Sequence, residues 1–279
     1  MNGPLVLDLH KILRQRLPSR VGKLVPGFAI SWMEKLIRQE GLNEILRVTY
    51  PSRGSEFSSK VLRHLDISVE VEGLESLPDG RRYMFASNHP LGGLDGIALI
   101  WVLGKKYGDD KVRFLVNDML MNVEPLREMF LPVNKFGAQG RGAVEAINAV
   151  MESDMQVLQF PAGLVSRLHD DGSVSDLEWQ KAFVTKAIEY RRDIVPVRFV
   201  AANSPKFYKT ARRRKKLGIK FNIEQILLPA EIFKSKSKNF RIIFGKPISW
   251  EELKSKEATP KALAAEIRSI VYRMGDPEF

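Results

Sequence analysis

The sequence predicts an α/β protein with a largely parallel central sheet flanked by helices, and a helical appendage at the N-terminus. Short apolar runs of strand length alternate with longer helix-like segments along most of the chain. Such alternation is typical of parallel sheets, because parallel neighbours need a crossover that a helix supplies. Several strand-like runs also end in turns that carry polar residues and glycine. In parallel sheets, ligands bind at these carboxyl ends of the strands.

The chain has 279 residues, of which 44% are hydrophobic, and is long enough to form one large domain or a domain with an appendage. We expect a helical N-terminal region at residues 1–60 and a main domain at residues 61–279. In the first region, apolar residues recur at helical spacing from Phe28 to Leu46, with Lys35 and Arg38 between them. This basic amphipathic segment can pack on the main domain, lie in lipid headgroups, or do both with different faces.

The main domain is expected to begin with a helix and then to alternate. Strands are expected at residues 67–71, 82–87, 112–116, 157–160, 194–200 and 241–244. Helices are expected at residues 57–66, from about 97 to 106, and at 125–130, 143–151 and 178–191. Two further helices are expected after Ser249, which forms a capping box with Glu252, and after Thr259-Pro260. We predict a solvated turn at 168–172 and assign no function to His169.

The turn at Ser87–Gly96 contains the residues best suited to catalysis. It follows the apolar run Tyr83–Ala86 and holds a proline and two adjacent glycines. His89 leaves the end of the strand and Asp95 lies near the start of the next helix, so the carboxylate can orient the imidazole and raise its basicity. The alternative is a turn in which both side chains only satisfy backbone groups, and the spacing alone leaves both interpretations open. If the pair is catalytic, the lack of a Ser or Cys nucleophile between the two residues favours a base that acts on a substrate hydroxyl.

Three motifs, in order along the chain, resemble those of the glycerolipid acyltransferases of the lysophosphatidic acid (PlsC-like) type. Asn88-His89 followed by Asp95 is similar to the family's N-H-x-x-x-x-D, with one extra residue. Phe160–Ser166 resembles F-P-E-G-T-R-S, and Ile194–Val197 resembles the closing I-V-P-V strand. The resemblance extends over roughly residues 69–248. It implies an α/β acyltransferase fold with His89 as the catalytic base and Asp95 as the residue that orients it.

The departures from these motifs point to one branch of the family. The family's glutamate is replaced by Ala162, and the position of its arginine falls on Val165. Together with the extra glycine, these changes resemble the branch described as putative haemolysins, which includes O-acyltransferases of ornithine and glycine lipids. The resemblance implies a substrate-binding set, in which Arg167 is a candidate ligand for a carboxylate and Arg141, at a glycine-rich helix start, for an anion. The full set is Asn88, Lys135, Arg141, Ala162, Gly163, Ser166 and Arg167.

The resemblance implies transfer of a fatty-acyl chain from a thioester, either acyl-carrier protein or acyl-CoA, to the hydroxyl of a 1-acylglycerol-3-phosphate-like lysolipid. An alternative acceptor is an N-acyl amino-acid lipid such as lyso-ornithine or lyso-glycine lipid. An alternative of another class is a non-enzymatic protein that binds anionic membranes. We expect no bound cofactor and no metal, because the four histidines lack metal-ligand spacing.

A net charge of +11 favours a polyanionic partner. Residues 206–220 contain eight lysines and arginines and no acidic residue, which is suited to an anionic membrane surface or to a solvated helix. Nucleic acid is disfavoured, because this stretch has few aromatic residues on which bases could stack. The chain has no cysteine, no secretory signal pattern and no apolar run long enough for a transmembrane helix. We therefore expect peripheral contact with the cytoplasmic face of a membrane.

Overall fold

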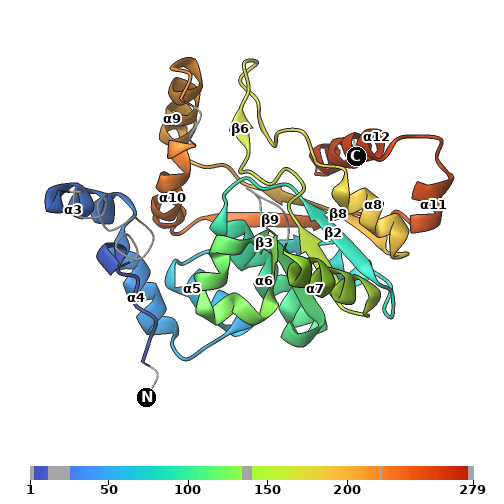
Figure 1. Cartoon of the computed structure of the whole chain (residues 1–279), viewed down its shortest axis with the longest axis horizontal. Coiled ribbons are helices and arrows are strands. Elements are labelled where there is room, and N and C mark those ends of the chain that lie inside the picture. The colour runs from blue at the N-terminus through green and yellow to red at the C-terminus, as the bar shows by residue number, and fades with distance from the viewer. Residues whose placement is uncertain (1–2, 12–25, 134–139, 220–221, 276–279) are drawn as a thin grey trace.

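In a computed structural model, residues 3–11, 26–133, 140–219 and 222–275 are described, and they form an α/β fold with a seven-stranded central sheet. The strand order is β1-β9-β8-β2-β5-β3-β4 (Figure 1). The strands are β1 (Ser68–Glu72), β2 (Tyr83–Ser87), β3 (Val112–Asn117), β4 (Phe130–Val133), β5 (Gln156–Gln159), β8 (Asp193–Val200) and β9 (Asn239–Phe244). Every neighbouring pair is parallel except β8 and β9, so the predicted largely parallel sheet is confirmed.

Strand β2 lies at the centre of the sheet, and its side chains alternate between two apolar layers. Tyr83 and Phe85 are buried in the layer that contains α5 (Gly54–His64) and α6 (Gly93–Tyr107). Met84 and Ala86 are buried in the opposite layer with α8 (Ala182–Glu189) and α12 (Pro260–Arg273). Because both faces of β2 are covered, its sequence is a continuous apolar run.

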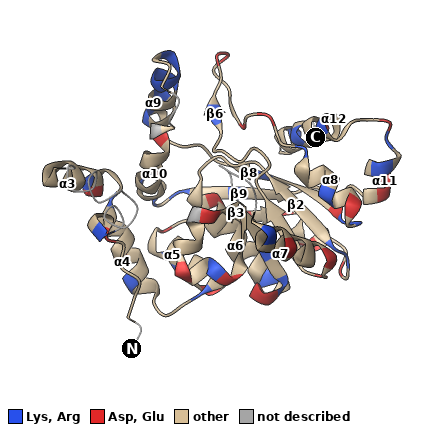
Figure 2. Ribbon diagram, in the orientation of Figure 1, with Lys and Arg blue, Asp and Glu red and all other residues tan. Residues whose placement is uncertain are grey.

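The other helices extend these layers or lie at the edges of the sheet. They are α3 (Gly27–Leu36), α4 (Gln39–Thr49), α7 (Arg141–Glu152), α9 (Pro205–Lys216), α10 (Leu228–Lys234) and α11 (Trp250–Ser255). A short hairpin of β6 (Arg167–Leu168) and β7 (Val174–Ser175) projects from the sheet beside α9 (Figure 1). The lysines and arginines of α9 are prominent in Figure 2.

Most predicted elements are confirmed, with shifts of a few residues at their ends. The segment Phe28–Leu46 is a correction: it forms two helices, because Arg38 adopts a left-handed conformation with φ of 58°. The guanidinium of Arg38 stacks 5.2 Å from the ring centroid of Phe233, on α10, and an added Cβ at Gly41 would lie 2.7 Å from the same ring. The bend thus lets α4 pack against α10. The predicted division at residues 60/61 stays a prediction.

Three further findings concern elements whose bounds depend on tertiary contacts. Strand β4 was not expected, and it forms because Phe130–Val133 pairs with β3. The predicted turn at 168–172 lies within the β6–β7 hairpin, where His169 Nε2 is 2.9 Å from Ser175 Oγ. The helix expected from residue 178 begins only at Ala182, because the N–H of Gln180 bonds to the carbonyl of Pro161 at 3.0 Å.

Candidate active site

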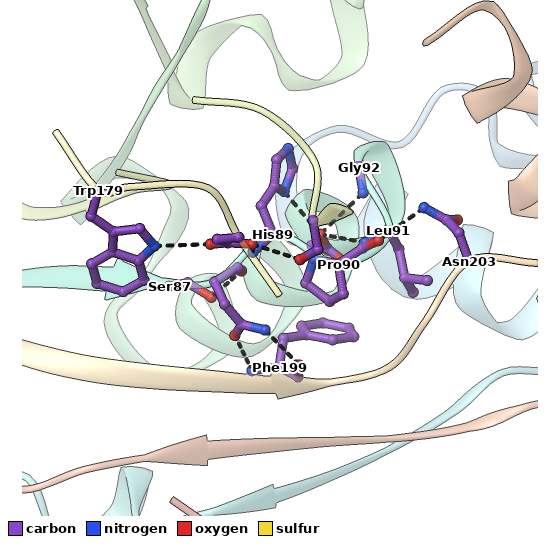
Figure 3. Close-up of polar contacts among 12 residues, drawn as sticks. Ser87, His89, Pro90, Leu91, Gly92, Trp179, Phe199 and Asn203 are labelled. Atoms are coloured by element: carbon purple, nitrogen blue, oxygen red, sulfur yellow. Dashed lines mark hydrogen bonds and ion pairs between the residues drawn. The ribbon is translucent and has the colours of Figure 1, made fainter. Parts of the chain in front are cut away.

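The turn after β2 places His89 at the carboxyl edge of the sheet. Asn88 fixes the start of the turn: its amide donates to the carbonyl of Phe199 at 2.9 Å and accepts from the Phe199 N–H at 2.6 Å. At the far side, Asn203 donates to the carbonyl of Pro90 at 2.9 Å. Figure 3 shows His89 between Trp179 and Asn203 in this group of contacts. Strand β8 and the segment after it thereby hold both sides of the His89 turn.

Gly92 completes the turn in a conformation that a side chain would disturb. Its φ is 88°, in the region that favours glycine. An added Cβ would lie 3.3 Å from Leu228 of α10 and 3.5 Å from Val165. The backbone conformation therefore favours glycine at this position, and the neighbouring side chains leave little room for a larger residue.

His89 and Asp95 form the contact that their spacing predicts. Nδ1 of His89 lies 2.8 Å from Oδ2 of Asp95, and the imidazole side chain is 18% exposed while the carboxylate is fully buried. Proximity of Asp95 to Nδ1 favours the tautomer that carries its proton there and leaves Nε2 as the basic nitrogen.

Asp95 also stabilises the turn that contains His89. Its carboxylate accepts the N–H of Leu91 at 2.9 Å and that of Gly92 at 3.1 Å. Burial raises the pKa of Asp95, while the contact with His89 and the two N–H groups oppose this shift. One side chain therefore fixes both the imidazole and the backbone beside it, at a desolvation cost.

The motif Phe160–Ser166 lies directly over the His89 turn. The ring of Phe160 stacks on the His89 imidazole, with centroids 4.1 Å apart and planes inclined by 26°. The N–H of Ser166 donates to the carbonyl of His89 at 2.8 Å. Between these contacts, Ala162 is buried against the α8 and α12 layer, and Gly163 is exposed with φ of 62°. The structure thus brings together the two motifs in which the sequence placed most of the predicted site.

Two of the predicted substrate-binding residues have partners within the chain. Both amide atoms of Asn88, which is 1% exposed, bond to the backbone of Phe199, and a substrate contact for Asn88 stays a prediction. Ser166 is 2% exposed, and its hydroxyl donates to Asp176 Oδ1 at 2.6 Å. A substrate contact for Ser166 stays a prediction.

Arg167 lies in a buried cluster of charges. Its Nη2 is 2.9 Å from Glu224 Oε1, and Nε of Arg214 is 2.9 Å from Glu224 Oε2. Glu224 is fully buried, and burial lowers the pKa of Arg167. Arg167, which is predicted to bind a substrate carboxylate, is thus paired with Glu224, and Glu224 also contacts Arg214.

Arg141 and Lys135 are placed differently. Arg141 is exposed at the start of α7, which follows the strand β4 on the same sheet edge as His89. Lys135 lies outside the described residues. The roles predicted for both residues stay predictions.

Backbone N–H groups near glycines 92, 93 and 163 are candidates for stabilising the oxyanion of an acyl-transfer intermediate. The structure shows that two of these N–H groups already have partners. The N–H of Gly92 donates to Asp95, and that of Gly163 donates to the carbonyl of Phe160 at 2.9 Å. Neither is available to an oxyanion in this conformation.

Sequence reasoning missed Asp176, Glu224 and Asn203, which hold the site together from three separate segments. Their buried side chains contact the His89 turn or the loop that follows β5. No local motif marks them, since each becomes interpretable only through a partner many residues away. Among the described residues, no group of three or more His, Asp or Glu side chains is placed to hold a metal ion.

The fold and the site define a class of protein: an α/β enzyme with a carboxylate-oriented histidine at the carboxyl edge of its sheet, suited to general-base chemistry on a hydroxyl. The model of the family described as Acyltransferase matches residues 11–272, which is most of the chain. The chain therefore belongs to this acyltransferase family and is an acyltransferase. Membership implies an acyl donor as co-substrate.

Curated relatives match over nearly the full chain. The lyso-glycine lipid O-acyltransferase of Bacteroides thetaiotaomicron is 43% identical over 96% of this chain and 97% of its own length. The protein of the same description from Phocaeicola vulgatus is 41% identical over 96% of this chain and 95% of its own. Among solved structures, the 1-acyl-sn-glycerophosphate acyltransferase PlsC of Thermotoga maritima aligns with a TM-score of 0.45 and 16% identity, covering 86% of this chain and 88% of that one.

Proposed function

We propose that this protein transfers a fatty-acyl chain from a thioester donor to the hydroxyl of a lysolipid, with a lyso-glycine-type amino-acid lipid as the acceptor. The observation that carries the proposal is the 2.8 Å contact between His89 Nδ1 and the buried carboxylate of Asp95 at the end of β2. The two curated relatives support the choice of acceptor, because both are described as lyso-glycine lipid O-acyltransferases.

In the proposed reaction, His89 is the general base. With the proton of Nδ1 directed to Asp95, Nε2 accepts the proton of the acceptor hydroxyl as its oxygen attacks the thioester carbonyl carbon. The tetrahedral intermediate then collapses, the C–S bond breaks, and the imidazolium returns its proton to the leaving thiolate. The products are the ester and the free thiol, and His89 is regenerated as the base.

Substitutions in the second motif favour an amino-acid lipid over a 1-acylglycerol-3-phosphate acceptor. Ala162 takes the place of a glutamate and Val165 that of an arginine that the resemblance to the glycerolipid enzymes would lead one to expect. In the structure both residues are buried in apolar surroundings. The phosphate acceptor, 1-acylglycerol-3-phosphate, remains the second candidate. Its phosphate would be bound by exposed Arg141, which lies on the same sheet edge as His89.

The test is a side-by-side assay with one labelled acyl chain. Acyl-carrier protein and CoA thioesters are each offered with an N-(3-hydroxyacyl)glycine and with 1-acylglycerol-3-phosphate. We expect ester product from the glycine lipid, and we expect His89→Ala to lower kcat by about 100- to 10,000-fold. Comparable turnover by a folded His89→Ala protein would refute the mechanism. Product from the phosphate acceptor alone would refute the proposed acceptor. Comparison of the rates with acyl-carrier protein and with CoA thioesters would identify the acyl donor.

We further propose that the enzyme works at the cytoplasmic face of a membrane. Helix α9 ends in Arg212–Lys216, followed by Leu217, which is 74% exposed, and Ile219, which is 40% exposed. Cations beside exposed apolar side chains are suited to an anionic lipid surface. No helix in the described ranges is long and apolar enough to cross a bilayer.

Cosedimentation with vesicles of neutral lipid and of neutral plus anionic lipid tests this proposal. We expect binding to the anionic vesicles that weakens as salt is added. Charge reversal at exposed Lys215 is expected to weaken it, and the same change at exposed Lys254 of α11 serves as the control. Equal binding to both vesicle types would refute it. Binding without any acyl transfer would favour the non-enzymatic alternative.

A further inference from the structure

A buried carboxylate that no motif identifies joins the two loops of the site. Oδ1 of Asp176 accepts the backbone N–H of His89 at 3.2 Å and the hydroxyl of Ser166 at 2.6 Å. Its Oδ2 accepts the indole N–H of Trp179 at 3.0 Å. In Figure 3, Trp179 lies on one side of His89. Asp176 is fully buried.

The backbone of Asp176 is itself fixed by the last helix of the chain. Its N–H donates to Tyr272 Oη at 2.6 Å, and its carbonyl accepts from Arg268 at 2.5 Å. Both partners lie on α12, which packs on the sheet through buried apolar residues. The carboxylate is therefore anchored to a rigid element on one side and holds the active-site turn on the other.

The chemistry of these contacts is costly for a merely structural residue. The side-chain oxygens of Asp176 are held by neutral donors, from Ser166, Trp179 and the His89 backbone, while Arg268 bonds to its backbone carbonyl. A buried carboxylate held by neutral donors loses much of its hydration energy. An asparagine of the same shape would avoid this cost, but it has one acceptor oxygen for donors that lie on two sides. What the carboxylate provides is a single acceptor atom that fixes the His89 backbone and the Ser166 loop relative to each other.

We propose that Asp176 is a positioning residue for catalysis, which sets the position of the His89 imidazole by holding the His89 backbone N–H and the Ser166 hydroxyl on one oxygen. The proposal rests on the proposed role of His89 as the general base. Since a shift of about 1 Å in a reacting group can reduce the rate by roughly 100-fold, loss of this acceptor is expected to reduce kcat and to leave KM largely unchanged.

The test substitution is Asp176→Asn, and Asp193→Asn is a matched control. Asp193 is also a buried aspartate, 4% exposed, but it lies at the start of β8, where it pairs with Arg81 and accepts the N–H of Trp250. That end of the sheet is opposite to His89. We expect both variants to lower Tm, and only Asp176→Asn to lower kcat per folded molecule, by about 10- to 100-fold.

A rescue variant covers the case in which Asp176→Asn folds poorly. An amide at this position puts an N–H group against the indole N–H of Trp179 or against the backbone N–H of His89. Changing Trp179 to Phe in the same protein removes the indole donor, so the amide oxygen can turn to His89. The double variant is expected to recover kcat to within about threefold of Trp179→Phe alone. A folded double variant that gains nothing would overturn the proposal.

A readout that does not depend on turnover separates this proposal from the proposed function. In protein labelled with ¹⁵N-histidine, the amide signal of His89 is identified by its absence in His89→Ala. Asp176→Asn is expected to move this signal upfield and to speed its hydrogen exchange, while Asp193→Asn leaves it in place. An unchanged His89 amide together with unchanged kcat would overturn the positioning role. Absence of acyl transfer in the wild-type protein would instead overturn the proposed function.

Discussion

Replacing Asp95 by asparagine separates the catalytic and the structural contributions of this side chain. Oδ2 of Asp95 lies 2.8 Å from Nδ1 of His89 and also accepts the N–H groups of Leu91 and Gly92, at 2.9 and 3.1 Å. An asparagine oxygen in this place keeps these contacts but has no charge to stabilise the imidazolium that forms when Nε2 accepts the substrate proton. An asparagine nitrogen there would favour the tautomer with the proton on Nε2 and would oppose the two backbone N–H groups, so either orientation weakens the base.

The expected loss of activity follows from the loss of the base. General-base catalysis contributes about 100- to 10,000-fold, which corresponds to roughly 3–5 kcal/mol of barrier. We expect Asp95→Asn to lower kcat within this range while the acceptor still binds. Initial rates of labelled acyl transfer at saturating lysolipid measure this effect. A fall of less than about threefold would refute the role assigned to the pair.

Stability is expected to change in the opposite sense. Burial raises the pKa of Asp95 above that of the unfolded chain, so the native state binds this proton more tightly. The resulting stabilisation is fully present below the unfolded pKa and is lost as pH rises through the native pKa. At neutral pH the wild type therefore carries the cost of a buried charge that asparagine avoids. We expect the Tm of Asp95→Asn to match or exceed that of the wild type at pH 7 and to lose this advantage in acid, as followed by circular dichroism. A variant markedly less stable at pH 7 would contradict this account.

Three further predictions concern stability and are tested by urea unfolding with circular dichroism. Arg192 is fully buried and donates five hydrogen bonds to backbone carbonyls, and burial lowers its pKa to about 10. Because Arg192→Lys removes at least two of these bonds, it is expected to lower the free energy of unfolding by about 3 kcal/mol or more. A loss below about 1 kcal/mol would contradict this expectation. Gly73 has φ of 77°, and an added Cβ would lie 2.1 Å from the backbone oxygen of Phe244. Gly73→Ala is therefore expected to lower the free energy of unfolding by more than about 2 kcal/mol. The control is Gly80→Ala, because an added Cβ at Gly80 meets open space. Glu224→Gln leaves Arg167 and Arg214, whose side chains are only 11% and 14% exposed, without their anion and is expected to cost about 3–5 kcal/mol. Unchanged stability would show that the cluster is not held by charge.

The turn that contains His89 was predictable because its signals are local. An apolar run of strand length, a break at proline and glycine and a helix-length run after it fix the positions of His89 and Asp95 within a few residues of each other. The contact between them then needs only one tight turn, and the structure confirms it at 2.8 Å. The same reasoning placed β2 and β8, whose apolar runs are longer.

Contacts between distant segments were not predictable in this way. Glu224 is one of many acidic residues in the sequence, and only the approach of α9 to the β6 strand makes it the counterion of two arginines. Arg167 is predicted to bind a substrate carboxylate, and only the structure shows that Glu224 of the chain itself lies 2.9 Å from its guanidinium. The break at Arg38 likewise depends on Phe233, almost two hundred residues away.

The sequence by itself determined the class of fold, the order of most strands and helices, and the histidine and aspartate of the site, because hydrophobic periodicity and turn chemistry act over a few residues. Only the tertiary structure decided which polar groups support that pair. Asp176, Asn88 and Asn203 acquire their roles when β5, β8 and α12 bring their partners to one edge of the sheet. A buried polar group must find a partner wherever packing places one, and that requirement leaves no local pattern in the chain.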